Sequence, residues 1–373
     1  MKNLFSLLTA GTLALGALSA QAQFTVDGVL SSTEIGTGVG KYQLAGSYTG
    51  THLEADRGLQ ALYVGYTATT LNIMVVGVGE SASGNYRALI LYLNTAGRTG
   101  TAKGTKLIGG NDGPSPLVHK PTLDMEVDYG FRASIGATSN TASDVYFSRV
   151  SYVTGTTIAP GTDSYIGQGS KAGAQVVAGS STADLAGSKF AYKNAGTITT
   201  NTANNGFEVE IPLTMLGTAT SPVTVGSTID LFAAFTDGGG VFTSADIIPQ
   251  VAGRTTAFGA DPDFTLIPGT QAVSFVLGTG ALASRAGVAT GLGFGVYPNP
   301  AEQAAATAAY LVPSGRQDVA LSVYNTMGQL VRSVARGPQV GPQQVSLGAL
   351  PAGAYLVRLQ VGDQATSRTL LVH

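Results

Sequence analysis

The sequence of 373 residues contains no cysteine, no tryptophan and only three histidines. Without cysteine the chain can form no disulfide bond, no thiolate nucleophile and no cysteine-ligated zinc site. Only 11% of the residues are charged and the net charge is −2, so the basic face that nucleic-acid binding requires is missing. The common histidine-zinc, Gly-x-Ser-x-Gly and phosphate-loop motifs are also absent. These absences favour a non-catalytic protein that binds no nucleic acid.

Glycine is abundant, with 51 residues, about twice the usual share of ~7%. Together with many threonines, serines, valines and tyrosines, this composition predicts short strands joined by tight turns. The length predicts more than one domain, because single hydrophobic cores rarely grow beyond ~250–300 residues.

The first 22 residues have the pattern of a secretory signal peptide. Lys2 precedes an apolar run from Leu4 to Leu18, and Ala20-Gln21-Ala22 supplies the small residues of a cleavage site. The run is interrupted by polar residues and is shorter than the ~20 apolar residues that cross a bilayer. We therefore expect removal after Ala22 and a mature chain, without a transmembrane span, that is exported through the periplasm.

The C-terminal part of the chain predicts a small separate domain. Residues 278–295 are rich in glycine, show no periodicity and are expected to form a flexible linker. Residues 296–373 alternate between strand-like segments and turns, and Val319, Leu321 and Val323 recur every second residue. This pattern predicts a small antiparallel β-sandwich.

Three short segments of this region occur in an order that is specific to one family. Val296-Tyr-Pro-Asn-Pro300 opens the region, Gly328 follows Val323-Tyr-Asn325, and Leu350-Pro-Ala-Gly-Ala-Tyr355 comes near the end. The region resembles the C-terminal sorting domain, subtype A, of type IX secretion. The residues that carry the resemblance are Tyr297, Pro298, Asn299, Pro300, Gly328, Pro351, Gly353 and Tyr355. His373 stands where that family often has lysine.

The resemblance implies an Ig-like sandwich that guides the chain through a translocon in the Gram-negative outer membrane. It also implies that a surface sortase removes the domain, after which the passenger is anchored at the cell surface or released into the extracellular space.

Residues 23–277 form the expected passenger domain. Alternating or continuous apolar segments predict strands at, among others, 61–67, 70–78, 88–94, 123–135, 144–153, 207–211 and 228–236. Only Leu213–Leu216, after Pro212, has a helical pattern, and the glycine-rich stretches 96–118 and 155–206 are expected to form long loops. We predict an all-β, jelly-roll-like sandwich of two antiparallel sheets, with Ile73, Val75, Leu91 and Leu93 inside.

Two segments of the passenger resemble carbohydrate-binding modules of the family-nine type and DOMON-like sandwiches. They are Phe24–Leu30 with Glu34 after it, and Gly206–Leu213. The resemblance implies a sandwich whose first and late strands pair, and a sugar ligand. The sequence departs from the family in having no tryptophan with which to clamp a sugar.

Leu123–Tyr129 places three carboxylates at alternate positions, Asp124, Glu126 and Asp128. On a strand these side chains would share one face at ~7 Å intervals. Their mutual repulsion would be relieved by Ca²⁺, which prefers oxygen ligands. They are the candidate calcium ligands, and a solvated strand face is the alternative. Glu208 and Glu210 repeat the pattern on a shorter strand.

Aromatic rings can stack on the apolar face of a sugar, and several tyrosines of the passenger are available. They are Tyr42, Tyr48, Tyr63, Tyr66, Tyr86, Tyr92, Tyr146, Tyr152 and Tyr165. The sequence does not select among them, so the ligand-binding residues stay open. The predicted function is that of an exported, non-catalytic binding module, and polysaccharide is the ligand class that the resemblance implies. A structural or adhesive surface protein and a carboxylate-based polysaccharide hydrolase are the alternatives.

Overall fold

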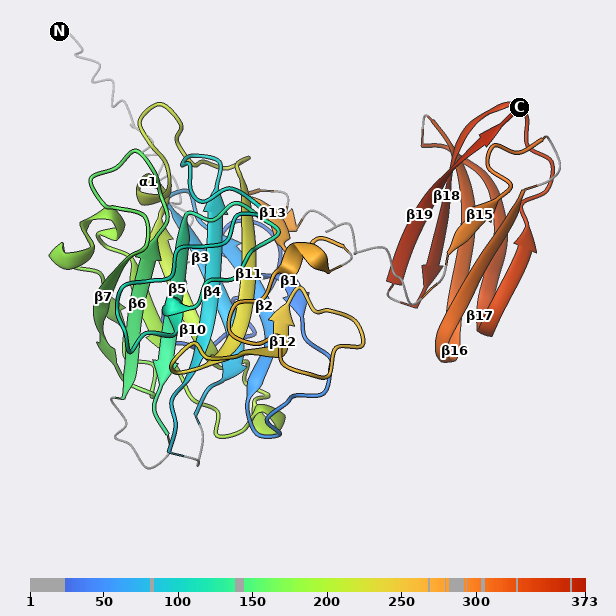
Figure 1. The fold of residues 1–373 in the computed structure, drawn as a ribbon. Coiled ribbons are helices and arrows are strands. Elements are labelled where there is room, and N and C mark those ends of the chain that lie inside the picture. Colours follow the sequence, from blue (N-terminus) through green and yellow to red (C-terminus); the bar gives the residue numbers. More distant parts are fainter. Residues whose placement is uncertain are drawn as a thin grey trace, which may run out of the picture.

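The computed structural model describes residues 24–373 except 81–83, 138–143, 268, 279, 282–291, 293, 303–305, 327 and 363. The predicted signal peptide and most of the predicted linker therefore lie outside the described residues. The described chain consists mainly of antiparallel strands, with one α-helical turn, α1 (Leu213–Leu216), and four short 3₁₀ segments. The all-β prediction is confirmed (Figure 1).

One sheet of the passenger has six strands in the order β1-β2-β3-β10-β9-β8. Their bounds are β1 (Gln43–Ser47), β2 (Gly58–Tyr66), β3 (Thr70–Val78), β8 (Val176–Val177), β9 (Lys189–Tyr192) and β10 (Gly206–Pro212). The pairing of β3 with β10 joins segments more than 120 residues apart in the chain, and it runs without a bulge from Thr70↔Pro212 to Val76↔Gly206.

The other sheet has eight strands in the order β14-β13-β11-β4-β5-β6-β7, with β12 paired to β11. Their bounds are β4 (Arg87–Thr95), β5 (Tyr129–Ile135), β6 (Val145–Ser151), β7 (Thr162–Gly169), β11 (Thr228–Asp237), β12 (Thr243–Ile248), β13 (Val273–Val276) and β14 (Gly280–Ala281). Residues 155–206, which we expected to be loop, thus contribute β7, β8 and β9.

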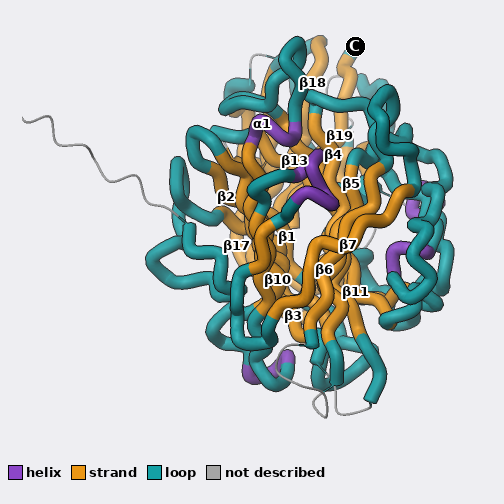
Figure 2. Tube along the Cα trace, turned by 90° about the vertical axis from the view of Figure 1, so that its left-hand side faces the viewer, coloured by secondary structure: helices purple, strands orange, loops and turns teal. Residues whose placement is uncertain are grey.

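The main core lies between these two sheets, which Figure 2 shows as two layers of strands with loops outside them. Ile73 and Val75 from one sheet and Leu91 and Leu93 from the other are fully buried in it, as the alternation in the sequence predicts. Phenylalanines fill its centre: the rings of Phe147 and Phe207, on opposite sheets, stack with centroids 5.7 Å apart.

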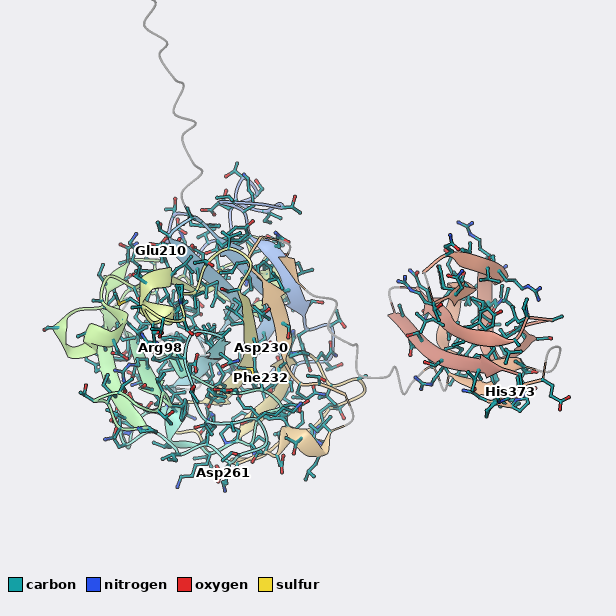
Figure 3. All side chains as sticks on the ribbon, turned by 90° about the horizontal axis from the view of Figure 1, so that it is seen from above. Arg98, Glu210, Asp230, Phe232, Asp261 and His373 are labelled. Carbon is teal, nitrogen blue, oxygen red and sulfur yellow. The ribbon has the colours of Figure 1, made fainter. Side chains whose placement is uncertain are left out.

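A second apolar layer covers part of the outer face of the eight-stranded sheet. Long loops, including the Pro116–Val118 turn and residues 249–272, pack over Ile90, Tyr92 and Phe232. In Figure 3 Phe232 lies on the sheet and Asp261 lies at the outer margin of these loops. The loops leave the opposite end of this face open.

Over its described residues, the N-terminal segment contacts a late strand but forms no strand of its own, so the pairing of a first and a late strand implied by the family-nine-type resemblance is not observed. Val29 bridges Asn205, and the fully buried Glu208 on β10 accepts hydrogen bonds from the amides of Asp27 (2.9 Å) and Gly28 (2.8 Å) and from the Tyr42 hydroxyl (2.7 Å). Glu208 thus connects the start of the domain to its central strands.

The predicted strand 123–135 is wrong in its first half. The strand begins at Tyr129. Within residues 123–128 only Val127 takes part in a bridge, an isolated one with Thr101. The reason is that the segment runs beside the loop at residues 99–107: Thr101 and Val127 exchange backbone hydrogen bonds of 2.9 Å, and Gly104 N donates to Leu123 O. The side chains therefore do not alternate across a sheet.

The C-terminal strands pair only among themselves within the described part of the chain. They are β15 (Gly295–Tyr297), β16 (Thr307–Asn325), β17 (Leu330–Ser346), β18 (Gly353–Val361) and β19 (Gln364–Val372). Their core contains Val319, Leu321 and Val323 and also Leu292 and Phe294. Among the residues that the structure describes, the core of this unit therefore already includes Leu292, inside the segment that we assigned to the linker.

In this C-terminal unit, residues 299–301 are hydrogen-bonded to β19. Ala301 forms a parallel bridge with Val372. The Asn299 side chain donates to Thr369 O (2.7 Å) and accepts from Leu371 N (3.0 Å). An asparagine amide here takes the place of a backbone unit beside β19.

Candidate functional site

A cavity of about 890 Å³ lies on the uncovered end of the outer face of the eight-stranded sheet. Phe131, Ala133 and Ile135 of β5 point into the main core, so Arg132 and Ser134 between them point to the opposite face, into this cavity. We name it the tyrosine cleft. Its lining residues are Asn85, Tyr86, Arg87, Asp112, Pro114, Arg132, Ser134, Tyr146, Tyr165, Asp237, Gly238, Gly239 and Phe242.

Three tyrosines from different segments of the chain, with Phe242, form the aromatic part of the cleft. Tyr86 precedes β4, Tyr146 lies on β6 and Tyr165 lies on β7, where it pairs with Ser148. The Tyr86 and Tyr146 rings are 6.1 Å apart between centroids, and Tyr165 is 49% exposed. Partly exposed rings provide apolar surface that a ligand can still reach.

The ring positions are fixed by a carboxylate beneath them. The Tyr86 hydroxyl donates to Asp144, 2.6 Å from either oxygen, and Asp144 is itself buried. Burial and this hydrogen bond raise the pKa of Tyr86, and the hydrogen bond with Asp144 raises that of Tyr146. Both hydroxyls therefore stay protonated at neutral pH, and the aromatic surface is preorganised.

Arg132 forms the polar floor of the cleft. Its Nη1 donates to the Ser134 hydroxyl (2.8 Å), and its Nη2 lies 3.6 Å from an Asp112 oxygen. Burial lowers the pKa of Arg132, and Asp163 and Asp112 act against that change. Burial has the opposite effect on a carboxyl and raises the pKa of Asp163. The buried guanidinium is thus compensated by carboxylates around it.

The turn between β11 and β12 also lines the cleft, through Asp237, Gly238, Gly239 and Phe242. Asp237 Oδ1 accepts hydrogen bonds from Val241 N (2.7 Å) and Phe242 N (3.1 Å), which fixes the turn. A Cβ at Gly238 would lie 2.5 Å from the Tyr86 Cβ. Glycine at this position is what lets the turn lie directly against Tyr86 and narrow the cleft.

The structure selects among the nine tyrosines that the sequence left open. Tyr42, Tyr48, Tyr66, Tyr92 and Tyr152 are buried in the packed layers, and Tyr63 packs on the outer side of the six-stranded sheet. Tyr86, Tyr146 and Tyr165 meet at the cleft. The sequence analysis missed Arg132, although the apolar–polar alternation of residues 131–135 places it on the face opposite the core. It also missed Asp112, Asp237 and Phe242, which reach the cleft from loops or a strand end.

The three candidate calcium ligands each bind a different protein group. Asp124 pairs with Lys103 (2.6 Å) and accepts from Gln271 N, Glu126 accepts from Gly100 N, and Asp128 accepts from the Thr95 amide and hydroxyl. Their common strand face does not exist. Among the residues that the structure describes, no group of three or more histidines and acids could hold a metal ion. The calcium prediction has lost its geometric basis.

Asp128 and the second acidic pair are buried structural groups. Burial raises the pKa of Asp128 to about 6, although its hydrogen bonds from Thr95 act in the opposite direction. Burial raises the pKa of Glu208 to about 7 against the same kind of opposition. Glu210 pairs with Lys189 (2.6 Å) and accepts from Asn72.

The predicted sorting-signal residues lie at two places in the C-terminal unit. Tyr297, Pro298, Asn299 and Pro300 form its entry, where Asn299 binds β19. Gly328 (φ +77°) lies in the β16–β17 turn, and the Tyr355 hydroxyl donates to the carbonyl oxygen of Pro351 (2.8 Å), two residues before Gly353. A hollow of about 490 Å³ brings Gly328 and Tyr355 together.

Residues 295–373 match the family model described as secretion system C-terminal sorting domain. This match confirms the resemblance found at 296–373 and identifies this part of the chain as a type IX sorting domain, which indicates an exported protein. None of the helices that the structure describes is both long and apolar enough to traverse a membrane.

No curated protein matches the chain significantly. Among solved structures, the dimeric latent PorU from Porphyromonas gingivalis is 12% identical with a TM-score of 0.18, and the match covers 82% of this chain and 32% of that one. The BSP domain of a biofilm associated protein is 12% identical with a TM-score of 0.17, covering 87% of this chain and 53% of that one. The chain thus spans a third to a half of these proteins, and scores this low carry no argument.

Proposed function

We propose that the passenger is a non-catalytic carbohydrate-binding module and that the tyrosine cleft holds the sugar. The observation that carries this proposal is the gathering of Tyr86, Tyr146 and Tyr165 at one open cavity of about 890 Å³. That volume lies in the range of ligand-binding clefts. Tyrosine rings supply the apolar surface that stacks on a pyranose ring, in the role that tryptophan has in other sugar-binding proteins.

The polar lining suits the remaining surface of a sugar. Asp112 and Asp237 offer carboxylate oxygens as acceptors for hydroxyl groups, and Ser134 and Arg132 offer donors. Because the Asp144 carboxylate holds the Tyr86 and Tyr146 hydroxyls, little side-chain freedom would be lost on binding.

Binding of the protein to a glycan array tests the proposal. We expect retention of at least one class of polysaccharide, and a loss of about tenfold or more in affinity for Tyr146→Ala and Tyr165→Ala, as for truncated aromatic anchors. Tyr297→Ala is the matched control, because Tyr297 is 46% exposed, much like Tyr165 at 49%, but lies on the C-terminal unit. Equal binding by all three variants would place the sugar elsewhere.

The same samples distinguish a binding module from a hydrolase. A carboxylate-based hydrolase would release new reducing ends from a bound polysaccharide, and the release would stop in Asp112→Asn or Asp237→Asn. We expect no release from the wild-type protein during prolonged incubation. Measurable release of reducing ends that stops in these variants would show that the cleft is the active site of a hydrolase.

For export, we propose that the C-terminal unit engages the outer-membrane translocon and that a surface sortase then removes it. The passenger would remain on the cell surface or be released. Deletion of Leu292–His373 should leave the passenger in the periplasm, because the separate core of this unit already includes Leu292. Arrival of the truncated passenger at the surface would contradict this route.

A further inference from the structure

The charges around the tyrosine cleft are unequal in number. The carboxylates in or directly behind its lining outnumber the guanidinium groups. The acids are Asp112, Asp237, Asp144, Asp163 and Glu54, and the bases are Arg87 and Arg132 in the lining and Arg57, which pairs with Glu54 behind it.

Both guanidinium groups of the lining are already engaged by the protein. Arg87 makes hydrogen bonds to both oxygens of Glu54, with distances of 2.6–3.0 Å. Arg132 is buried, donates to Ser134 through Nη1 and is opposed by Asp112 and Asp163, while its Nε has no hydrogen-bond partner in the part of the chain that the structure describes. The charge of each guanidinium is therefore already opposed by carboxylates of the protein.

The two carboxylates on the rim remain reachable. The Asp112 side chain is 38% exposed. Asp237 uses one oxygen, Oδ1, for the amides of its turn, and its residue is partly exposed. Both acids line the cavity, so a ligand that fills the cleft meets both of them, and the Tyr86 ring is held by the buried Asp144. An anionic ligand meets like charge there, and like-charge contacts are costly where water is partly excluded.

We infer that the tyrosine cleft selects neutral or amine-bearing sugars and rejects uronic acids. The inference rests on the proposed function, since it names the class of glycan that the same cleft accepts. The rim carboxylates would accept hydrogen bonds from hydroxyl groups of a neutral sugar, or from a protonated amine in a charge-assisted bond. The carboxylate of a uronic acid would replace these contacts by repulsion.

Three β-1,4-linked hexasaccharides test the selection among neutral, amine-bearing and acidic sugars. They are the hexamers of glucose, glucosamine and glucuronate. Calorimetric titration of the full-length protein at low salt should give affinities in the order glucosamine, glucose, glucuronate, with the glucuronate hexamer at least about tenfold weaker than the glucose hexamer. The gap should narrow at 0.5 M NaCl, because salt screens charges near the surface.

Asp237→Asn and Asp112→Asn supply the decisive variants. Asparagine at position 237 keeps an oxygen for the Val241 and Phe242 amides, so the turn is retained. Each change should strengthen glucuronate binding and weaken glucosamine binding several-fold, whereas Asp318→Asn, an exposed change on the C-terminal unit, should alter neither.

The outcomes separate the two claims. Glucuronate binding as tight as glucose binding, or an order of affinities that neither aspartate variant changes, overturns the charge selection while the carbohydrate-binding proposal stands. Binding of none of the hexamers, together with no retention on the glycan array, overturns the proposed function itself and this inference with it.

Discussion

Replacing Glu208 with glutamine perturbs a fully buried carboxyl of the passenger without changing the shape of the side chain. Glu208 is fully buried and receives three hydrogen bonds, from Asp27 N, Gly28 N and the Tyr42 hydroxyl. These donors favour the ionised form, but burial outweighs them and raises the pKa of Glu208 to about 7 from its ordinary value of 4.5. The folded protein therefore binds this proton more tightly than the unfolded chain does.

The sign and size of the effect follow from linkage. The proton contributes its full stabilisation below about pH 4.5 and that contribution is lost as the pH rises through about 7. A shift from 4.5 to about 7 corresponds to about 3 kcal/mol, at 1.36 kcal/mol per pKa unit. Glutamine carries no charge to bury, so Glu208→Gln should escape this loss.

Urea unfolding of the full-length protein and the variant from pH 4.5 to 8 measures the difference. The free energy of unfolding of the variant, relative to the wild type, should rise by about 3 kcal/mol across this range. At pH 8 this corresponds to a gain of about 2–4 °C in Tm for each kcal/mol.

Tyr42→Phe serves as the opposite perturbation. It removes a hydrogen bond that lowers the pKa of Glu208. The free energy of unfolding of this variant should therefore fall by more than that of the wild type as the pH rises, and the fall should extend to higher pH. If the stabilities of wild type and Glu208→Gln stayed parallel across the whole range, the three donors would keep the carboxyl ionised and the reasoning would be refuted.

Three further predictions concern other parts of the chain. Phe294→Ala should destabilise the sorting domain by about 3–5 kcal/mol, because Phe294 is buried in its core. Calorimetry should show the thermal transition of the passenger unchanged, and a lower Tm in both transitions would contradict separate cores. Arg149→Leu should lower passenger stability by about 3–5 kcal/mol in urea titrations, since it leaves Asp184 without its 2.7 Å partner; an unchanged midpoint would show that water replaces the arginine. Added Ca²⁺ should not raise Tm, and a rise that disappears in the double variant Glu126→Gln with Asp128→Asn would restore the calcium prediction.

The strands with clear apolar alternation could be predicted from the sequence. The predicted 70–78 is β3 with the same bounds, 88–94 lies within β4, and Leu213–Leu216 is the one α-helical turn. The sorting domain was also recognisable, because its turn residues and their order are specific. These features depend on local pattern, which the sequence carries directly.

The cleft could be predicted only in part, because it depends on pairing between distant segments. Tyr146 and Tyr165 become neighbours through the β6–β7 pairing, and Tyr86 joins them through β4 and β5. The error at residues 123–128 has the same origin. Their alternating carboxylates match a strand, but the chain there pairs with the loop at residue 101 instead of a sheet, and pattern alone cannot distinguish the two.

The contacts between Asn299, Ala301 and β19 make the sorting domain sensitive to the completeness of its final strand. A chain that stops before Gln364 lacks β19, so Asn299 loses both partners and the edge of β18 has no neighbour. Loss of β19 alone would therefore release the segment that opens the unit, 70 residues earlier in the chain.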